Sequence, residues 1–280
     1  MAKSLERQAL ETIGKKWDKG KGTREKLLLN TREFAKFVSD RYGLEKIENL
    51  KPKMIEAYIR DAHARGLAAS TLAGKMTALR ELAYAIGKPN IVPRDNKAYG
   101  IERIRVNPQM VASDKLNEIR EALITRAISG DQIARMMVAA GALRESFGLR
   151  AKESLLSKDL IERDGTLYLV IEGAKGGRCR ELAVDTDAKL RAVQLVAETS
   201  KGLGSKTGRI IPPSMSLQSA YNVQRNTWRA LGGTRENNAN MHGQRHGHAR
   251  SMAANGATKA EIMAELGHGE DRSPSSYGIK

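Results

Sequence analysis

Six side chains in the second half of the chain combine the groups needed to break a phosphodiester bond without a metal ion. Such a reaction needs a nucleophile, cations that clamp the non-bridging oxygens, an acid for the leaving oxygen and a base. A phenol, two guanidinium groups, an ammonium group and two imidazoles could supply all of these. In chain order the residues are Arg150, Lys175, His242, Arg245, His268 and Tyr277.

The order and spacing of these residues resemble the active site of the tyrosine recombinases, the phage-integrase family. His242 and Arg245 form a His-x-x-Arg pattern, and Tyr277 is the ninth residue after His268. The resemblance implies a site-specific recombinase or integrase of a mobile element or prophage. Such an enzyme cleaves and rejoins DNA through a 3′-phosphotyrosine intermediate, with no metal ion or ATP.

The segment around Arg150 also matches this family. The family's first box has Gly-x-Arg-x-x-Glu followed by Leu and Asp, and the chain keeps Gly148, Arg150, Glu153, Leu156 and Asp159. Arg150 and Glu153 share one face if the segment is helical. Glu153 could then fix a guanidinium that grips a phosphate. The alternative is a surface ion pair of little energetic value.

The resemblance implies that Arg150, Arg245 and His268 hold and neutralise the scissile phosphate while Tyr277 attacks it. A free phenol has a pKa of about 10 and is scarcely ionised at neutral pH, so it needs nearby positive charge or a base. The alternative for Tyr277 is an ordinary surface or packing residue near the end of the chain.

The same resemblance assigns proton transfer to two residues. His242 is the assisting group, and Lys175 is the general acid for the 5′-oxygen. A flexible ammonium group on a hairpin turn suits this role. The alternative is a solvated turn lysine, and Lys152, Arg178 and Arg180 are the competing cations nearby.

The histidine-rich segment has two further interpretations. His242, His246 and His248 could bind a metal ion, since histidines four residues apart share a helix face. Gly243, however, stands where the zinc-protease motif has Glu, and no acidic residue is nearby. We therefore predict neither a metal nor a cofactor. The second alternative is a merely basic helix that lies on DNA.

The charge balance favours a polyanionic partner. The chain has 48 Lys and Arg against 32 Asp and Glu, a net charge of +16. Residues 1–115 contribute +10 and residues 116–280 contribute +6, so both halves are basic. Net charge is a sound argument about partners. The alternative is a basic protein with no role on nucleic acid.

The expected partners are double-stranded DNA with specific recombination sites and three further copies of the chain, which form a tetramer on DNA. Accessory DNA-bending or directionality proteins are also compatible with the family.

The one cysteine, Cys179, cannot form an internal disulfide, which suits a reducing compartment. The first residues contain no apolar core of a signal peptide, and no apolar run approaches the roughly 20 residues of a membrane span. We expect a cytoplasmic protein.

The elements that would position these residues are predicted to be mainly helices, with a small sheet. Residues 1–88 are predicted to form a helical domain, with a helix over 25–42, one starting at Pro52 and one capped by Ser70 or Thr71. The resemblance implies that this is the family's core DNA-binding domain. Prolines and glycines interrupt 89–115, the expected basic linker. Its cations are expected to touch DNA phosphates, together with Arg178 of the later hairpin; they are Arg94, Lys97, Arg103 and Arg105.

Residues 116–280 are predicted to form the catalytic domain. A helix is expected from Ser129, then a strand over 166–172, a turn that carries Lys175 and a return strand over 180–184. Helices follow over 187–200 and 215–231. Thr258 and Glu261 have capping-box spacing, and Gly267 should end that helix in a left-handed turn that projects His268. The fold class is mainly α with a small antiparallel β-sheet (α+β).

Three other functions compete with integration. A type IB topoisomerase uses the same chemistry without synapsis of two sites. An Xer-type enzyme resolves chromosomes by the same strand exchange. A non-catalytic DNA-binding protein could keep the fold, but it would be expected to lack a catalytic residue, and none of the six is missing.

Overall fold

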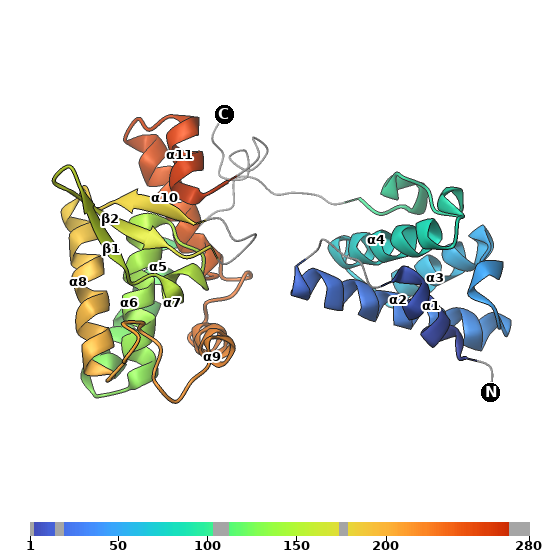
Figure 1. The fold of residues 1–280 in the computed structure, drawn as a ribbon, viewed down its shortest axis with the longest axis horizontal. Helices are drawn as coiled ribbons and strands as arrows, with labels where there is room; N and C mark the ends of the chain where they lie inside the picture. The colour runs from blue at the N-terminus through green and yellow to red at the C-terminus, as the bar shows by residue number, and fades with distance from the viewer. Residues whose placement is uncertain (1–2, 15–19, 103–111, 174–178, 269–280) are drawn as a thin grey trace. The chain divides into compact units, whose positions relative to one another are not determined.

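The computed structural model describes residues 3–14, 20–102, 112–173 and 179–268. The chain divides into two compact units, Met1–Arg105 and Val106–Lys280 (Figure 1). Across the described residues the fold is mainly helical with one three-stranded antiparallel sheet, which confirms the predicted class. None of the helices in these ranges combines the length and the apolar character needed to cross a membrane.

The first unit is built mainly from four α-helices around an apolar core. Phe34, Tyr58 and Met76 lie at its centre, and the rings of Phe34 and Tyr58 meet edge to face at 5.2 Å. Pro52 opens its helix, as predicted, and Gly43 ends the preceding helix in a left-handed turn. The helices are α1 (Leu5–Ile13), α2 (Lys21–Tyr42), α3 (Pro52–Ala64) and α4 (Ala69–Ala85), with the short turn η1 (Ile47–Asn49).

The predicted cap of α4 is wrong. The helix begins at Ala69 and its N-cap is Ala68, which offers no side-chain hydrogen bond. Ser70 and Thr71 lie inside the first turn. The start is fixed by packing, because Leu72 and Met76 must face the core of the unit. Tertiary contacts have overridden the local capping preference.

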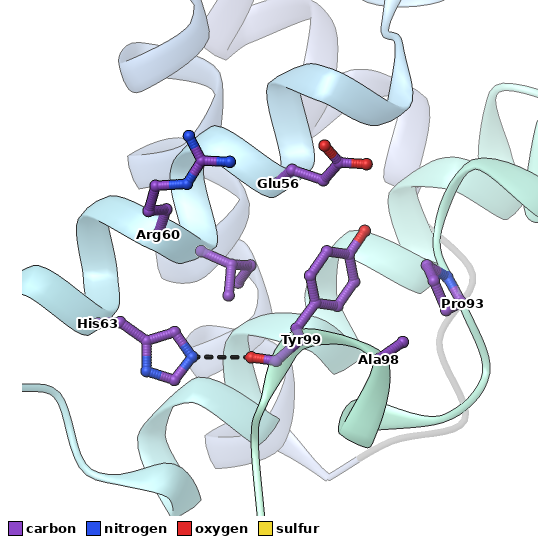
Figure 2. Close-up of a pocket in the computed structure, with 7 residues that line it drawn as sticks. Glu56, Arg60, His63, Pro93, Ala98 and Tyr99 are labelled. Carbon is purple, nitrogen blue, oxygen red and sulfur yellow. Dashed lines mark hydrogen bonds between the residues drawn. The ribbon is translucent and has the colours of Figure 1, made fainter.

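The first part of the expected linker folds onto the first unit. The turns η2 (Pro89–Ile91) and η3 (Asn96–Tyr99) lie there, and Val92 and Ile101 are buried in the first core. The ring of His63 makes a hydrogen bond of 2.9 Å with the Tyr99 carbonyl, which ties η3 to α3 (Figure 2). A cavity of about 420 Å³ opens beside this contact.

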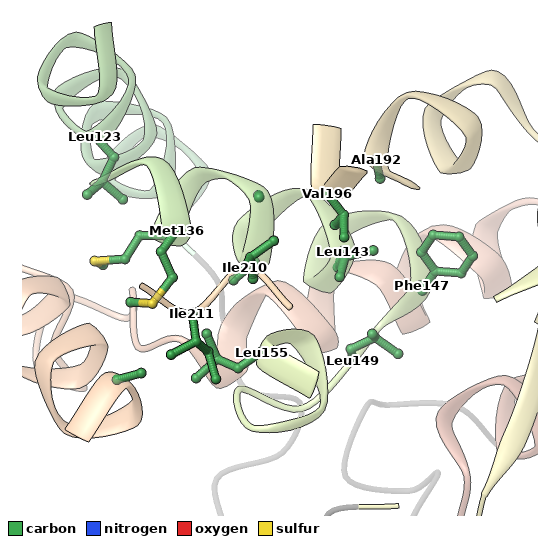
Figure 3. Packing of buried hydrophobic residues seen from close by; sticks show 14 of the residues in the cluster. Leu123, Met136, Leu143, Phe147, Leu149, Leu155, Ala192, Val196, Ile210 and Ile211 are labelled. Carbon is green, nitrogen blue, oxygen red and sulfur yellow. The ribbon is translucent and has the colours of Figure 1, made fainter. Parts of the chain in front are cut away.

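The second unit surrounds helix α6, which packs against α5, α8 and α10. Figure 3 shows the apolar core at this helix, where Met136, Leu143 and Phe147 are fully buried. Trp228 is buried too. The helices of the unit are α5 (Ser113–Ile128), α6 (Gln132–Phe147), α7 (Glu153–Leu156), α8 (Asp187–Gly202), α9 (Leu217–Ala230), α10 (His242–Ala254) and α11 (Lys259–Leu266).

The start of α6 differs from the prediction. Asp131 is the N-cap, and its carboxylate accepts from the backbone amides of Ile133 and Ala134. Ser129 instead lies at the C-terminal end of α5. Gly130, with φ of 98°, separates the two helices. A carboxylate at the N-cap also benefits from the helix dipole, which a serine hydroxyl cannot exploit as well.

The sheet contains the predicted hairpin and one further strand. Strands β2 (Thr166–Ile171) and β3 (Arg180–Ala183) pair antiparallel, with Leu169 opposite Leu182. Strand β1 (Leu160–Arg163) was not predicted, and it pairs with β2 on the other side. Asp164 and Gly165, with φ of 51° and 72°, form the turn between β1 and β2. This is the Asp-Gly signal of a tight hairpin.

Candidate active site

Arg150 is held by a buried carboxylate. It lies in the loop between α6 and α7, and its Nη1 donates to Glu153 Oε1 at 2.6 Å while its backbone amide donates to Oε2 at 2.8 Å. The Glu153 side chain is 1% exposed and that of Arg150 is 29% exposed. The pair is therefore no surface ion pair, and the guanidinium is oriented with one side open.

Hydrogen bonds keep Glu153 ionised despite its burial. Burial alone raises the pKa of this carboxyl group, but hydrogen bonds from Arg180 and Arg150 and the positive charge of Arg180 lower it to about 2. A carboxylate that accepts several hydrogen bonds from cations stays charged over the whole physiological range. The site thus contains a fixed negative charge between two guanidinium groups.

Arg245 lies deeper, on the first turn of α10. Its Nη1 donates to the Gly148 carbonyl at 2.6 Å, and its Nη2 donates to the Leu266 carbonyl at 2.5 Å. Nη2 also lies 2.9 Å from Nε2 of His268. Arg245 is 1% exposed. This one side chain therefore connects the ends of α6 and α11 and holds the histidine that follows α11.

The contact with Arg245 fixes the tautomer of His268. A guanidinium group only donates, so Nε2 of His268 must accept, and the proton of the neutral ring is on Nδ1. Burial and the positive charges of Arg245 and Arg150 lower the pKa of His268 to about 4. The ring is therefore neutral at pH 7. Gly267 presents it from a left-handed turn (φ 61°) after the capping box of Thr258 and Glu261, as predicted.

Gly148 lets these elements approach one another. It ends α6 with φ of 61°, a conformation that favours glycine. A Cβ at this position would lie 2.6 Å from Leu266 Cδ2 and 2.7 Å from His248 Cδ2. The glycine of the first box therefore allows the ends of α6, α10 and α11 to converge on Arg245.

His242 stands at the beginning of α10. Its ring meets that of His246 edge to face at 4.9 Å. Although His242 is an exposed residue, the protein around its ring and the charges of Arg245 and Arg150 lower its pKa to about 4. The pKa of His246, 4% exposed, is lowered to about 4 as well, by burial and by the neighbouring positive groups. Both rings are neutral at pH 7 and can accept a proton.

Arg150, Glu153 and His268 line a common cavity of about 190 Å³. Its walls come from the loop at Arg150, from the start of β3 and from the end of α11. We call it the basic pocket; its lining residues are Arg150, Glu153, Cys179, Arg180, Met263, Ala264, Gly267 and His268. The larger cavity of the first unit has one guanidinium group, from Arg60, and no such paired cations on a buried carboxylate.

Some of the predicted residues lie elsewhere. Arg94 and Lys97 belong to the first unit, where both are exposed. The remaining five fall outside the residues that the structure describes: Arg103, Arg105, Lys175, Arg178 and Tyr277. Their predicted roles stay predictions.

Arg180 and a buried polar network are the features that sequence reasoning missed. Arg180 was considered only as a competitor of Lys175, but it shares Glu153 with Arg150. Behind the site, Arg144 donates to Gln244 at 2.7 Å and Gln244 donates to Glu145 at 2.8 Å, which fixes α10 on α6. The position of Gln244 between His242 and Arg245 was the available signal for this network.

The three histidines considered for a metal ion have separate surroundings. His248 Nδ1 lies 3.0 Å from the Glu145 carbonyl, and its Nε2 lies 3.4 Å from Glu265. His242 and His246 contact each other. Within the described part of the chain, no group of three or more His, Cys, Asp or Glu side chains could hold a metal ion.

Two family models match the chain. The model described as integrase matches residues 110–251, just over half of the chain. The model described as the N-terminal part of phage integrases matches residues 27–92. The two matches fall on the second and first units, respectively.

Individual relatives agree with these matches. Tyrosine recombinase XerC of Agrobacterium fabrum is 29% identical over 258 residues, which cover 85% of this chain and 78% of the relative. Two solved structures share the fold: XerH recombinase bound to its difH substrate (17% identity, TM-score 0.62, 90% and 74% coverage) and a lambda integrase tetramer bound to a Holliday junction (19%, 0.64, 98% and 76%).

Proposed function

Because the chain belongs to the integrase family of tyrosine recombinases, we propose that it recombines DNA at specific sites through a covalent 3′-phosphotyrosine intermediate. Tyr277 is the proposed nucleophile. The observation that carries the proposal is the basic pocket, where Arg150 and His268 face a cavity and Arg245 lies against His268. These residues are far apart in sequence but converge on one place that suits an oxyanion.

The proposed phosphate clamp has an open and a buried part. Arg150 and His268 line the pocket and donate to the non-bridging oxygens. Arg245 holds Nε2 of His268, which fixes this ring at the wall of the pocket. Arg245 adds positive charge from behind. Preorganised donors of this kind stabilise the charge that develops in the transition state.

Proton transfer is assigned to two further residues. His242 is neutral at pH 7, so it can accept the phenolic proton of Tyr277. Lys175 is the proposed general acid for the 5′-oxygen. The phosphotyrosine bond conserves the energy of the broken linkage, and side chains supply every charge needed. We therefore infer that the reaction requires neither ATP nor a metal ion.

The proposed assembly is a tetramer on two DNA sites. Residues 1–88 would form the core DNA-binding domain and residues 116–280 the catalytic domain. The basic segment 89–115 would contact DNA phosphates. Both parts carry net positive charge, which supports contact with DNA by each. The lambda integrase tetramer on a Holliday junction supports the same stoichiometry here. Accessory bending or directionality proteins would act on this complex.

Xer-type resolution of chromosomes or replicons is the second candidate. It is favoured by the similarity to XerC over 85% of the chain. Both candidates use the same site and chemistry, and they differ in the DNA that is recombined.

A plasmid assay tests the proposed activity. Duplexes that the protein selects from a randomised pool are cloned in direct repeat on a supercoiled plasmid, and the protein is added with a chelator and without ATP. We expect deletion of the segment between the repeats. Relaxation without deletion would indicate a topoisomerase, and a requirement for a divalent ion would contradict the proposed chemistry.

A further inference from the structure

Arg180, the first residue of β3, lies at the wall of the basic pocket. Its Nη2 donates to Glu153 Oε2 at 3.1 Å and its Nη1 to Oε1 at 3.4 Å. Its Nε donates to the Glu265 carbonyl at 3.1 Å. The side chain is 13% exposed. All three nitrogens of the guanidinium group therefore contact protein groups, from two other elements of the site.

Arg150 and Arg180 each donate two hydrogen bonds to the Glu153 carboxylate. Oε1 accepts from Nη1 of both Arg150 and Arg180, and Oε2 accepts from the Arg150 amide and from Arg180 Nη2. Among the interactions that lower the pKa of Glu153, the hydrogen bond from Arg180 is the largest. A carboxylate that is 1% exposed depends strongly on such partners.

Arg180 also contacts the turn that presents His268. The Glu265 carbonyl lies in the last turn of α11, two residues before Gly267. A Cβ added at Gly267 would lie 2.9 Å from Arg180 Nη1. The guanidinium group is thus packed against the backbone of this turn, on the side of the pocket.

We infer that Arg180 is a positioning residue that holds the Glu153 carboxylate and the end of α11, so that Arg150 and His268 face the same phosphate. The inference rests on the proposed function of this pocket. It explains why a second guanidinium group lies beside Arg150 while its nitrogens are directed at protein acceptors. A guanidinium group also cannot serve as a general acid, because it does not deprotonate in proteins.

This role predicts a loss in cleavage rate with unchanged DNA affinity. The variants are Arg180→Met, which removes the donors, and Arg180→Lys, which keeps one cation. Arg163→Met is the matched control, because Arg163 is an exposed arginine of the same sheet that pairs with Glu181 at 3.0 Å. Thermal denaturation checks that all variants are folded.

The substrates are selected duplexes in two forms, one with an ordinary scissile phosphate and one with a 5′-bridging phosphorothiolate. The thiolate leaves without a proton. For Arg180→Met we expect a cleavage rate lower by roughly tenfold or more on both forms, because small displacements of catalytic groups have effects of this size. Arg180→Lys should recover part of the rate, and Arg163→Met should match the wild type.

A double-mutant cycle tests whether Arg180 acts through Glu153. In a Glu153→Gln background, Arg180→Met should cause a smaller further loss than in the wild type, because the carboxylate that it holds is gone and only its contact with the end of α11 remains. Additive losses would overturn the inference. A loss of affinity at unchanged rate would show a direct DNA contact instead. A loss confined to the ordinary phosphate would show a part in protonation.

The result with the wild type distinguishes a failure of the inference about Arg180 from a failure of the proposed function. If it forms a covalent adduct, the Arg180 variants decide the inference alone. If it forms none on either substrate, the proposed function fails, and the inference fails with it.

Discussion

Arg150 and Arg245, the two arginines predicted to bind the phosphate, have very different surroundings. Arg150 is partly exposed and paired with a buried carboxylate, whereas Arg245 is buried and donates to two backbone carbonyls and to His268. The sequence pattern predicts both as phosphate ligands and does not distinguish them. The partner of Arg150 was predictable, because Glu153 lies only three residues away. Arg245 instead donates to Gly148, 97 residues away, which local patterns do not encode.

Replacing Glu153 should reduce stability more than replacing Glu181, an exposed carboxylate of strand β3. Glu153→Gln removes the charge between two guanidinium groups and turns an amide donor toward them. We expect a loss of about 1–3 kcal/mol in the free energy of unfolding, measured by urea denaturation. Glu181→Gln, at a surface ion pair with Arg163, should lose less than about 1 kcal/mol. Equal losses would contradict the account of Glu153.

The histidines should make stability depend on pH. His242, His246 and His268 have pKa values lowered from 6.5 to about 4. Between these values the unfolded chain binds more protons than the folded one, so stability is complete above pH 6.5 and falls toward pH 4. His246→Phe should make this fall shallower, as urea denaturation at pH 7 and pH 5 can measure. The same fall in both proteins would contradict the lowered pKa of His246.

At the scale of elements, the periodic helices, the hairpin and the boundaries at Pro52 and Gly267 could be predicted from sequence, whereas the starts of α4 and α6 could not. Strand β1 was missed because Leu160–Arg163 is only four residues long and its apolar and polar residues do not alternate, although the Asp164-Gly165 turn was a usable signal. The prolines of 89–115 suggested a linker, yet Val92 and Ile101 are buried. Isolated apolar residues in a loop give no period to detect.

Convergence of α6, α10 and α11 depends on Gly148. Gly148→Ala would force an alanine into the left-handed conformation and bring its Cβ within 2.6–2.7 Å of Leu266 and His248. Gly43→Ala is the matched control, with φ of 57° and nothing within 4 Å. We expect the control to lose about 1–2 kcal/mol of unfolding free energy. Gly148→Ala should lose about 1–3 kcal/mol more, with reduced cleavage. Equal losses would mean that the elements do not need this close approach.

At the scale of the whole molecule, the net charge of +16 is spread over both halves of the chain. Composition alone predicted a polyanionic partner, and membership of the family identifies this partner as DNA. The sequence of the DNA target was not predictable, because phosphate contacts position a protein while base contacts specify the sequence.

DNA binding should weaken steeply with salt. Roughly six to ten phosphate contacts would lower the affinity by about 10³–10⁵ between about 50 and 200 mM salt. Fluorescence anisotropy with a labelled duplex measures the slope. An affinity that stays flat over this range would contradict binding through the basic surfaces of both units.

The nucleophile is the central claim, and a covalent adduct tests it most directly. Wild type and Tyr277→Phe are incubated with a selected duplex, labelled at either strand end and carrying a 5′-bridging phosphorothiolate, and are resolved on a denaturing gel. We expect an adduct of the wild type on the 3′-phosphate side of the break and none with Tyr277→Phe. An adduct that persists in the variant, or its absence from the wild type despite tight, salt-sensitive binding, would show that Tyr277 is not the nucleophile.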